Sequence, residues 1–207
     1  MTVKPSEKQT SNETEKLKTQ QQKQVELKQQ IPSQTQQKTQ QQTFPKEIEE
    51  IEKWTRLKAT EIIFNSEKDN WKKGSSVFDS KVKGKEKLVF YVETIDENVI
   101  GGVFMKRITS ISTKSHDDKC FLFSSQSGKM VKFPIILMRS SDALKICSRY
   151  DQNLFIFGND LTIGKEEFKD KSNVNEKDSI FTYTKRNAML GRVGTFDIKR
   201  VLVIQLK

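Results

Sequence analysis

Two runs rich in β-branched and aromatic residues lie close together near the middle of the chain, KLVFYVET at residues 87–94 and VIGGVF at residues 99–104. The segment between them contains Asp96, Glu97 and Asn98, polar residues of the kind that join hairpin strands. This arrangement predicts an antiparallel β-hairpin. Gly101 and Gly102 inside the second run indicate either a β-bulge or a close approach of another segment to the backbone.

The same pattern of short apolar runs continues on both sides of this hairpin. Clusters of glycine, asparagine, aspartate or lysine separate the runs, which is typical of an antiparallel β protein. About ten strands are expected, enough for two packed sheets or a barrel. Residues 201–204 are apolar at every position, so we expect the last strand to be covered on both faces. The expected strands are residues 61–64, 76–82, 87–94, 99–104, 120–124, 130–135, 153–157, 161–163, 179–183 and 195–205.

The N-terminal part of the chain has a different composition. Residues 1–46 contain 13 glutamines but only seven apolar residues, and their eight lysines and four glutamates give a net charge of +4. Such a segment buries too little apolar surface to offset the entropy lost on ordering. We therefore expect residues 1–44 to form a disordered tail rich in glutamine and lysine. The alternative is a coiled coil seeded by Leu17, Val25 and Leu27, although no apolar heptad is sustained around them.

A short amphipathic helix is expected between this tail and the β-rich part. Pro45 suits the first turn of a helix, and Ile48, Ile51, Trp54 and Leu57 follow at intervals of three residues. The predicted helix spans residues 45–58. The remaining residues, 59–207, are expected to form one β domain.

Composition and charge restrict the class of protein. The chain has 207 residues and a formal net charge of +10, which favours acidic protein surfaces or nucleic acid as partners. Its two cysteines are too few for a disulfide scaffold. We expect no transmembrane segment, because no apolar run approaches the roughly 20 residues that cross a bilayer, and no secretory signal. The expected location is the cytoplasm, with the nucleus as the alternative.

Four stretches of the β-rich part resemble the TLDc domain, a module shared by oxidation resistance proteins, nuclear receptor coactivator relatives and some Rab GTPase-activating proteins. They are NVIGGV at residues 98–103, DDKCFLFS at residues 117–124, LFIFGNDLTI at residues 154–163 and FDIKRVLVI at residues 196–204. The resemblance extends over roughly residues 58–207 and concerns structural positions. The matching residues are Gly101, Gly102, Asp118, Phe121, Phe123, Phe157, Gly158 and Phe196.

The resemblance implies both a fold and a role. The fold is a mainly β, two-sheet antiparallel β-sandwich with a few short helices. The role is oxidative-stress protection or binding of subunits of the vacuolar proton pump, without settled enzymatic chemistry. Val103 stands where the family commonly has an aromatic residue, and Phe78 lies in a segment bordered by lysine where animal members have a histidine. The family's partner surfaces therefore do not transfer residue by residue.

The sequence offers no complete catalytic, metal-binding or cofactor-binding constellation. His116 is the single histidine of the chain. With Asp117 and Asp118 it could supply part of a metal site, but a zinc site needs at least three protein ligands, so we expect a solvated loop. The glycines around Gly158 and Gly194 lack the spacing of a phosphate-binding or dinucleotide-binding loop. We expect no cofactor and a function other than catalysis.

Cys147 is a candidate redox thiol. It lies in the segment Lys145-Ile146-Cys147-Ser148-Arg149, where neighbouring cations would lower its pKa and favour the reactive thiolate. The alternative is a buried cysteine packed in the core, which is the usual environment of a free cysteine.

Alternating lysines form a candidate basic surface. Lys81, Lys83, Lys85 and Lys87 would lie on one face of a continuous strand, where they could bind phosphates or an acidic protein surface. Alternatively, they protect an edge strand from unwanted pairing.

Two functional hypotheses follow from these features. The first is a TLDc-like protein-interaction module, and the second is a DNA-associated or transcription-related factor that uses the basic surface and the glutamine-rich tail.

Overall fold

The structure is a computed structural model that describes residues 43–126, 128–183 and 188–207. The predicted tail, residues 1–44, and its alternative coiled coil around Leu17, Val25 and Leu27 lie almost wholly outside the described residues. The helix and the β domain expected from the sequence lie within them, apart from the short gaps.

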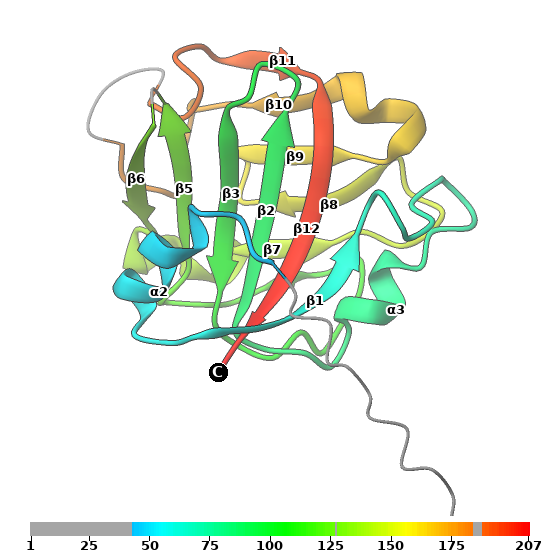
Figure 1. Ribbon diagram of the computed structural model, residues 1–207, viewed down its shortest axis with the longest axis horizontal. Helices are drawn as coiled ribbons and strands as arrows, with labels where there is room; N and C mark the ends of the chain where they lie inside the picture. Colours follow the sequence, from blue (N-terminus) through cyan, green and yellow to red (C-terminus); the bar gives the residue numbers. More distant parts are fainter. Residues whose placement is uncertain (1–42, 127, 184–187) are drawn as a thin grey trace, which may run out of the picture. The chain divides into compact units, whose positions relative to one another are not determined.

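The described residues form two antiparallel sheets of six strands each. Figure 1 shows one sheet lying in front of the other. The predicted two-sheet antiparallel architecture with a few short helices is confirmed. The first sheet has the order β1 (Ala59–Asn65), β12 (Ile198–Leu206), β2 (Leu88–Thr94), β3 (Val99–Phe104), β5 (Phe121–Gln126) and β6 (Lys129–Pro134). The second has the order β11 (Gly194–Phe196), β10 (Ser172–Val174), β9 (Leu161–Gly164), β8 (Asn153–Phe157), β7 (Leu144–Ile146) and β4 (Lys114–Ser115).

The main core lies between the two sheets and is rich in phenylalanine. The ring of Phe90 on β2 lies 5.0 Å from that of Phe155 and 5.4 Å from that of Phe157, both on β8. All three side chains are fully buried. Aromatic pairs at these distances add favourable edge and tilted contacts to the burial of apolar area.

The predicted hairpin forms, and its glycine pair allows close packing. Strands β2 and β3 pair from Leu88 with Phe104 to Glu93 with Val99 without a register shift, so a bulge, the first of the two interpretations of the glycine pair, is absent from this hairpin. A methyl group on Gly102 would lie 2.6 Å from the ring of Phe157, closer than atoms approach. The alternative interpretation, a close approach to the backbone, is therefore correct.

Strand β12 is covered on both faces, as its apolar sequence predicts. It lies between β1 and β2, with Val201 and Val203 in the core between the sheets. Leu202 and Ile204 belong to a second buried cluster on the outer face of the first sheet. The single strand expected at residues 195–205 is wrong in one respect, because its first part is β11 in the second sheet.

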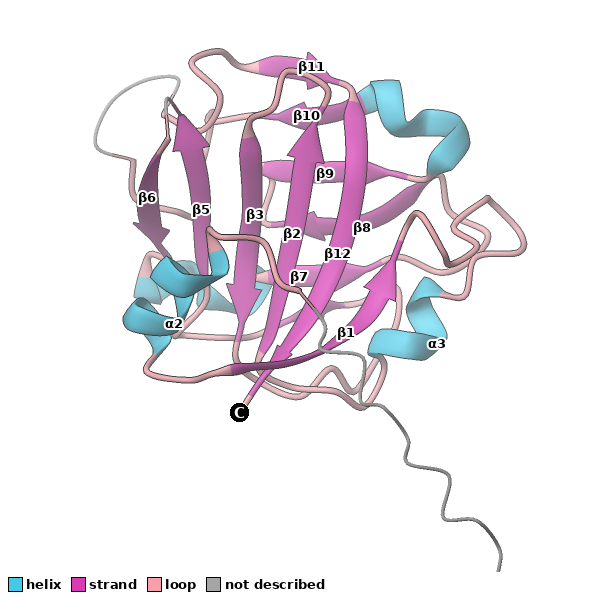
Figure 2. Ribbon diagram, viewed as in Figure 1, coloured by secondary structure: helices cyan, strands magenta, loops and turns pink. Residues whose placement is uncertain are grey.

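The predicted amphipathic helix covers this outer cluster. Helix α2 (Ile48–Thr55) is three residues shorter at each end than expected, and its first turn includes a hydrogen bond from Ile48 N to the carbonyl of Pro45 (3.0 Å). Ile48 and Ile51 are buried against the sheet. Arg56 adopts a left-handed conformation that ends the helix. Figure 2 shows α2 in front of the sheet near β5 and β6.

The strand expected at residues 76–82 is wrong, because this segment contains helix α3 (Phe78–Val82). Phe78 and Val82 are both buried. A spacing of four residues places two side chains on the same face of a strand or of a helix, so this pair could not distinguish the two. The prediction that one strand carries Lys81, Lys83, Lys85 and Lys87 on the same face is therefore wrong as well.

Other differences concern short elements. The strand expected at residues 179–183 is reduced to a single bridge between Ile135 and Phe181. Strands β4, β7 and β10 have only two or three residues each and were not expected. Two 3₁₀ helices, η1 (Leu137–Asp142) and η2 (Glu166–Lys171), complete the described elements. Among the helices of the described residues, none is long and apolar enough to cross a membrane.

Candidate functional site

Most residues that carry the TLDc resemblance are structural in this chain. Phe121, Phe123, Phe157 and Phe196 are buried. Gly158, in the turn between β8 and β9, has a positive φ of 57°, and a methyl group there would lie 2.6 Å from Ile180. These positions explain the fold and do not by themselves identify a binding site.

Asp118 is exposed, and its neighbour Asp117 makes the structural contacts. The buried carboxylate of Asp117 accepts hydrogen bonds from the backbone N–H of Met105 and of Lys119. Asp118 instead forms an ion pair with Lys106 at 3.7 Å. Sequence reasoning missed the role of Asp117, because adjacent aspartates in a loop give no sign of which one is buried.

His116 is exposed in the loop after β4, as expected for a solvated position. Within residues 43–126, 128–183 and 188–207, no group of three or more histidine, cysteine, aspartate or glutamate side chains could hold a metal ion. Asp117 uses its oxygens for the backbone contacts described above.

The surroundings of Cys147 are those of the alternative interpretation, a cysteine packed in the core. Cys147 is buried, and burial raises the pKa of its thiol to about 11 although Lys145 acts in the opposite direction. Removal of water disfavours the thiolate more than the nearby cations favour it. Cys120 is also buried and reduced, and burial followed by the charge of Asp117 raises its thiol pKa.

Lys165 is a buried residue that sequence reasoning did not single out. Its ammonium group donates hydrogen bonds to the carbonyl oxygens of Ser148 (2.7 Å), Asp151 and Asn153 (3.0 Å). Burial lowers its pKa. Three carbonyls satisfy the three N–H donors of the ammonium group, so Lys165 holds the loop before β8 and offers no free group for chemistry.

A groove of about 380 Å³ lies beside helix α2, where β5 and β6 meet the start of η1. We call it the α2 groove. Trp54 contributes from the helix, and its ring meets that of Phe121 on β5 edge to face, with centroids 5.9 Å apart. The apolar lining consists of Trp54, Met105, Cys120, Phe121, Pro134, Ile135 and Leu137.

Charged side chains border this apolar lining. The ammonium group of Lys132 lies 4.2 Å from the centroid of the Phe121 ring, a cation–π contact. Burial lowers the pKa of Lys132. Asp118 and Lys119 also line the groove. Among the described residues, no carboxylate forms an ion pair with Lys119 or Lys132.

An exposed apolar segment begins at the groove. Leu137 is 69% exposed and its neighbour Met138 is 97% exposed, while Ile136 is exposed to a lesser degree. The segment is held in place, because Ile136 N donates to the carbonyl of Ile180 and Arg139 donates to the carbonyl of Ser179. We call Ile136, Leu137 and Met138 the apolar loop.

Two loops gather basic residues at one end of the sandwich. The backbone of residues 84–87 pairs with that of residues 105–108 through hydrogen bonds from Gly84 N to Ile108 O (2.7 Å) and from Ile108 N to Lys85 O (2.8 Å). We call the resulting surface the basic end. It consists of Lys83, Lys85, Lys87, Lys106 and Arg107.

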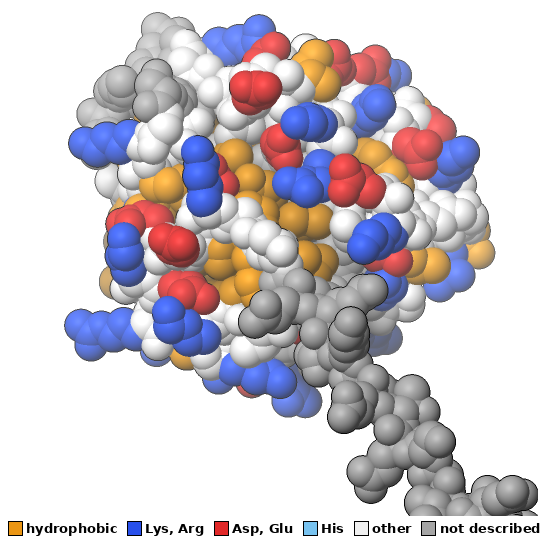
Figure 3. Space-filling view, in the orientation of Figure 1, with side chains coloured by type: hydrophobic (Ala, Val, Ile, Leu, Met, Phe, Trp, Pro, Cys, Tyr) orange, Lys and Arg blue, Asp and Glu red, His pale blue; other side chains and the backbone are white. Residues whose placement is uncertain are grey.

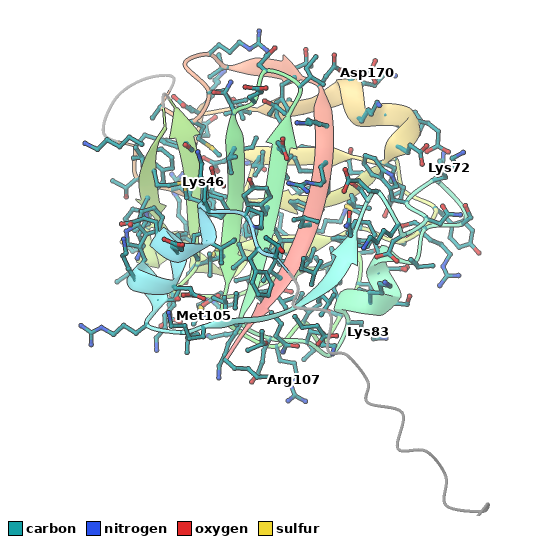
Figure 4. The ribbon with its side chains drawn as sticks, viewed as in Figure 1. Lys46, Lys72, Lys83, Met105, Arg107 and Asp170 are labelled. Atoms are coloured by element: carbon teal, nitrogen blue, oxygen red, sulfur yellow. The ribbon has the colours of Figure 1, made fainter. Side chains whose placement is uncertain are left out.

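Three of the four lysines of the expected stripe thus lie in or next to the paired loops, an arrangement that loop pairing sets and strand alternation does not. Lys81 is engaged elsewhere, in an ion pair with Asp69 at 2.7 Å. Figure 4 places Arg107 at the lower edge of the molecule, with Met105 toward the left of this edge and Lys83 toward the right. Figure 3 shows lysine and arginine side chains along the same edge. The acidic residue within the basic end is Glu86, which pairs with Arg107 at 3.6 Å.

Comparison with known proteins does not assign the chain to a family. No model of a protein family matches the chain, and no curated protein matches it. The functional interpretation therefore depends on the groove, the apolar loop and the basic end, together with the resemblance of the four sequence stretches.

Proposed function

We propose that this chain is a non-enzymatic, TLDc-like protein-interaction module that binds the vacuolar proton pump or takes part in oxidative-stress protection. The observation that carries the proposal is the apolar loop beside the α2 groove. Exposed side chains such as Leu137 and Met138, next to an apolar recess, are typical of surfaces that a protein partner covers.

The position of this surface on the fold supports the same function. The groove lies between a helix and the edge of a sheet, and the residues around it are fixed by buried contacts. Phe121 is paired in β5, Ile135 is buried, and Trp54 rests on Phe121. A surface that is already ordered before binding loses less conformational entropy when a partner arrives.

A pull-down with purified components tests the proposal. The full chain, immobilised through an added tag, is incubated with purified vacuolar proton pump, and retained subunits are identified by immunoblot. We expect retention by the parent protein and a large loss with Leu137→Asp, which places a charge in the apolar surface without disturbing a buried side chain. Tyr150→Asp is the matched control, because Tyr150 is similarly exposed (72%) on another loop. The absence of retention by the parent would refute pump binding.

A DNA-associated or transcription-related function is the second candidate, and the basic end favours it. Phosphate contacts would make binding fall steeply with salt. Filter binding of a duplex DNA across a salt series tests this function, with Lys83→Glu combined with Arg107→Glu as the variant that should lose binding. A chain lacking residues 1–42, tested in the same assay, separates binding by the tail from binding by the domain. Retention that is equally weak for the parent and the variant would remove this candidate.

A further inference from the structure

We infer that the α2 groove and the basic end form one docking site for an acidic protein segment that carries a large apolar side chain. This inference rests on the proposed function, because it names the chemistry of the partner that the interaction module would bind. The apolar side chain would enter the groove, and the acidic residues beside it would lie over the basic end.

The groove and the basic end adjoin each other at residues 105–107. Met105 lines the groove, and Lys106 and Arg107 of the basic end follow it directly. Asp118 also lines the groove and reaches Lys106 in an ion pair of 3.7 Å. A single extended segment could therefore contact both surfaces.

The groove suits one large apolar side chain. Its volume of about 380 Å³ lies within the range of binding pockets, roughly 300–1,000 Å³. Trp54, which is partly exposed, lines the groove and meets the buried ring of Phe121 edge to face. Leu137 forms a wall that is itself 69% exposed, so a ligand would bury additional apolar area there.

The charges favour an acidic partner. The combined surface has seven cationic side chains and two acidic ones. Among the described residues, Lys83, Lys85, Lys87, Lys119 and Lys132 have no ion pair with a carboxylate. Lys132 is half-buried over Phe121, and burial lowers its pKa, so an incoming carboxylate would stabilise its charged form.

Nucleic acid fits this surface less well than an acidic peptide. The lysines of the basic end have no aromatic side chain among them on which a base could stack. Trp54 and Phe121, the aromatic residues of the groove, face each other edge to face, and Phe121 is buried. A phosphate backbone would use the basic end and leave the apolar groove and the apolar loop uncovered.

The N-terminal segment of the same chain is a poorer occupant for the same electrostatic reason. Residues 1–42 contain seven lysines and four glutamates, so their net charge has the same sign as the basic end. A second copy of the chain would also bring a net charge of +10 to a basic surface. Like charges across an interface oppose association.

A peptide selection tests the inference without assuming a partner. A phage-displayed library of random short peptides is selected on the immobilised full chain, and the most enriched peptide is synthesised with a fluorescent label. We expect the enriched peptides to be acidic and to share one leucine, isoleucine, phenylalanine or methionine. The dissociation constant of the labelled peptide is then measured by fluorescence anisotropy.

Variants of each surface identify where the peptide binds. Leu137→Asp and the double variant Lys83→Glu with Arg107→Glu should each weaken binding by about tenfold or more. Tyr150→Asp is the matched control for Leu137→Asp, and Lys169→Glu on η2 is a charge-reversal control outside the docking site. Each variant should have a thermal unfolding temperature close to that of the parent protein, which establishes that its fold is intact.

Several results would overturn the inference. A selection that enriches no peptide, or enriches peptides that are not acidic, would do so. Peptide binding that is unchanged in Leu137→Asp would also contradict it. A duplex DNA that displaces the peptide, bound through the basic end and insensitive to Leu137→Asp, would assign the surface to nucleic acid. Self-association that Leu137→Asp abolishes would assign the groove to a second copy.

The two proposals fail separately. If the pump is retained equally by the parent protein and by Leu137→Asp, pump binding stands and the docking site is wrong. If acidic peptides bind the groove but the pump is not retained, the docking site stands and the pump is not the partner.

Discussion

Gly102 lets the ring of Phe157 in the second sheet rest against the backbone of the first sheet. We predict that Gly102→Ala destabilises the protein by about 1–3 kcal/mol, the usual cost of overpacking a core. Urea unfolding monitored by tryptophan fluorescence measures the loss. In the double variant Gly102→Ala with Phe157→Ala, the added cost of the alanine at position 102 should disappear. An equal cost in both backgrounds would contradict the contact.

Burial of Cys147 predicts how stability depends on alkaline pH. An unfolded cysteine has a pKa of about 8.5, whereas burial raises the pKa of Cys147 to about 11 in the folded protein. The folded state therefore holds the proton more tightly, and this contribution to stability is present below about pH 8.5 and is lost as the pH rises toward 11.

The variant Cys147→Val should remove this contribution. Between about pH 8.5 and 11, the unfolding free energy of the parent should fall by more than that of the variant. The upper limit of this difference is about 3.5 kcal/mol, from about 2.5 pKa units at roughly 1.4 kcal/mol per unit. Urea unfolding at several pH values gives both curves. Parallel curves would show that the thiol titrates normally and would reopen the redox hypothesis for Cys147.

Helix α2 stabilises the outer face of the first sheet through a small number of side chains. Ile51 is fully buried against this face, so Ile51→Ala should lower the unfolding free energy by about 2–5 kcal/mol. Glu49→Ala on the exposed side of the same helix should change it by less than about 0.5 kcal/mol. Chemical denaturation compares the two. A small effect of Ile51→Ala would mean that the helix contributes little to the folded state.

The elements that the sequence predicts well are those whose apolar pattern is long and unambiguous. Strands β2, β3 and β12 and helix α2 belong to this group. Helix α3 does not, because Phe78 and Val82 satisfy a strand and a helix equally. Strand β4 has only two residues and forms because β7 supplies its partner, a contact that no local pattern encodes.

The candidate site could be predicted only in part for a related reason. Trp54, Phe121 and Leu137 are far apart in the sequence, and each has the pattern of an ordinary helix, strand or loop residue. Only the paired sheets bring them together. Three of the lysines near residue 85 belong to the basic end, but loop pairing with residues 105–108 was needed to add Lys106 and Arg107.

At the scale of the whole molecule, the combination of an apolar groove and a basic end predicts a particular response of peptide binding to salt. The Debye length falls from about 10 Å at 0.1 M to about 3 Å at 1 M ionic strength, so attraction between the basic end and an acidic peptide is screened over this range. Burial of an apolar side chain in the groove is not weakened in this way. Affinity should therefore fall with salt and then level off at a value set by the groove.

The two surface variants should alter this response differently. The double variant Lys83→Glu with Arg107→Glu should bind weakly at low salt and show a flattened salt dependence, because the electrostatic part is already removed. Leu137→Asp should keep a salt dependence close to that of the parent while its affinity at high salt falls further, because the apolar part is lost. Fluorescence anisotropy titrations of the same labelled peptide across the salt series measure both curves. If the affinity of the double variant fell with salt as steeply as that of the parent, the acidic residues of the peptide would contact some other part of the molecule.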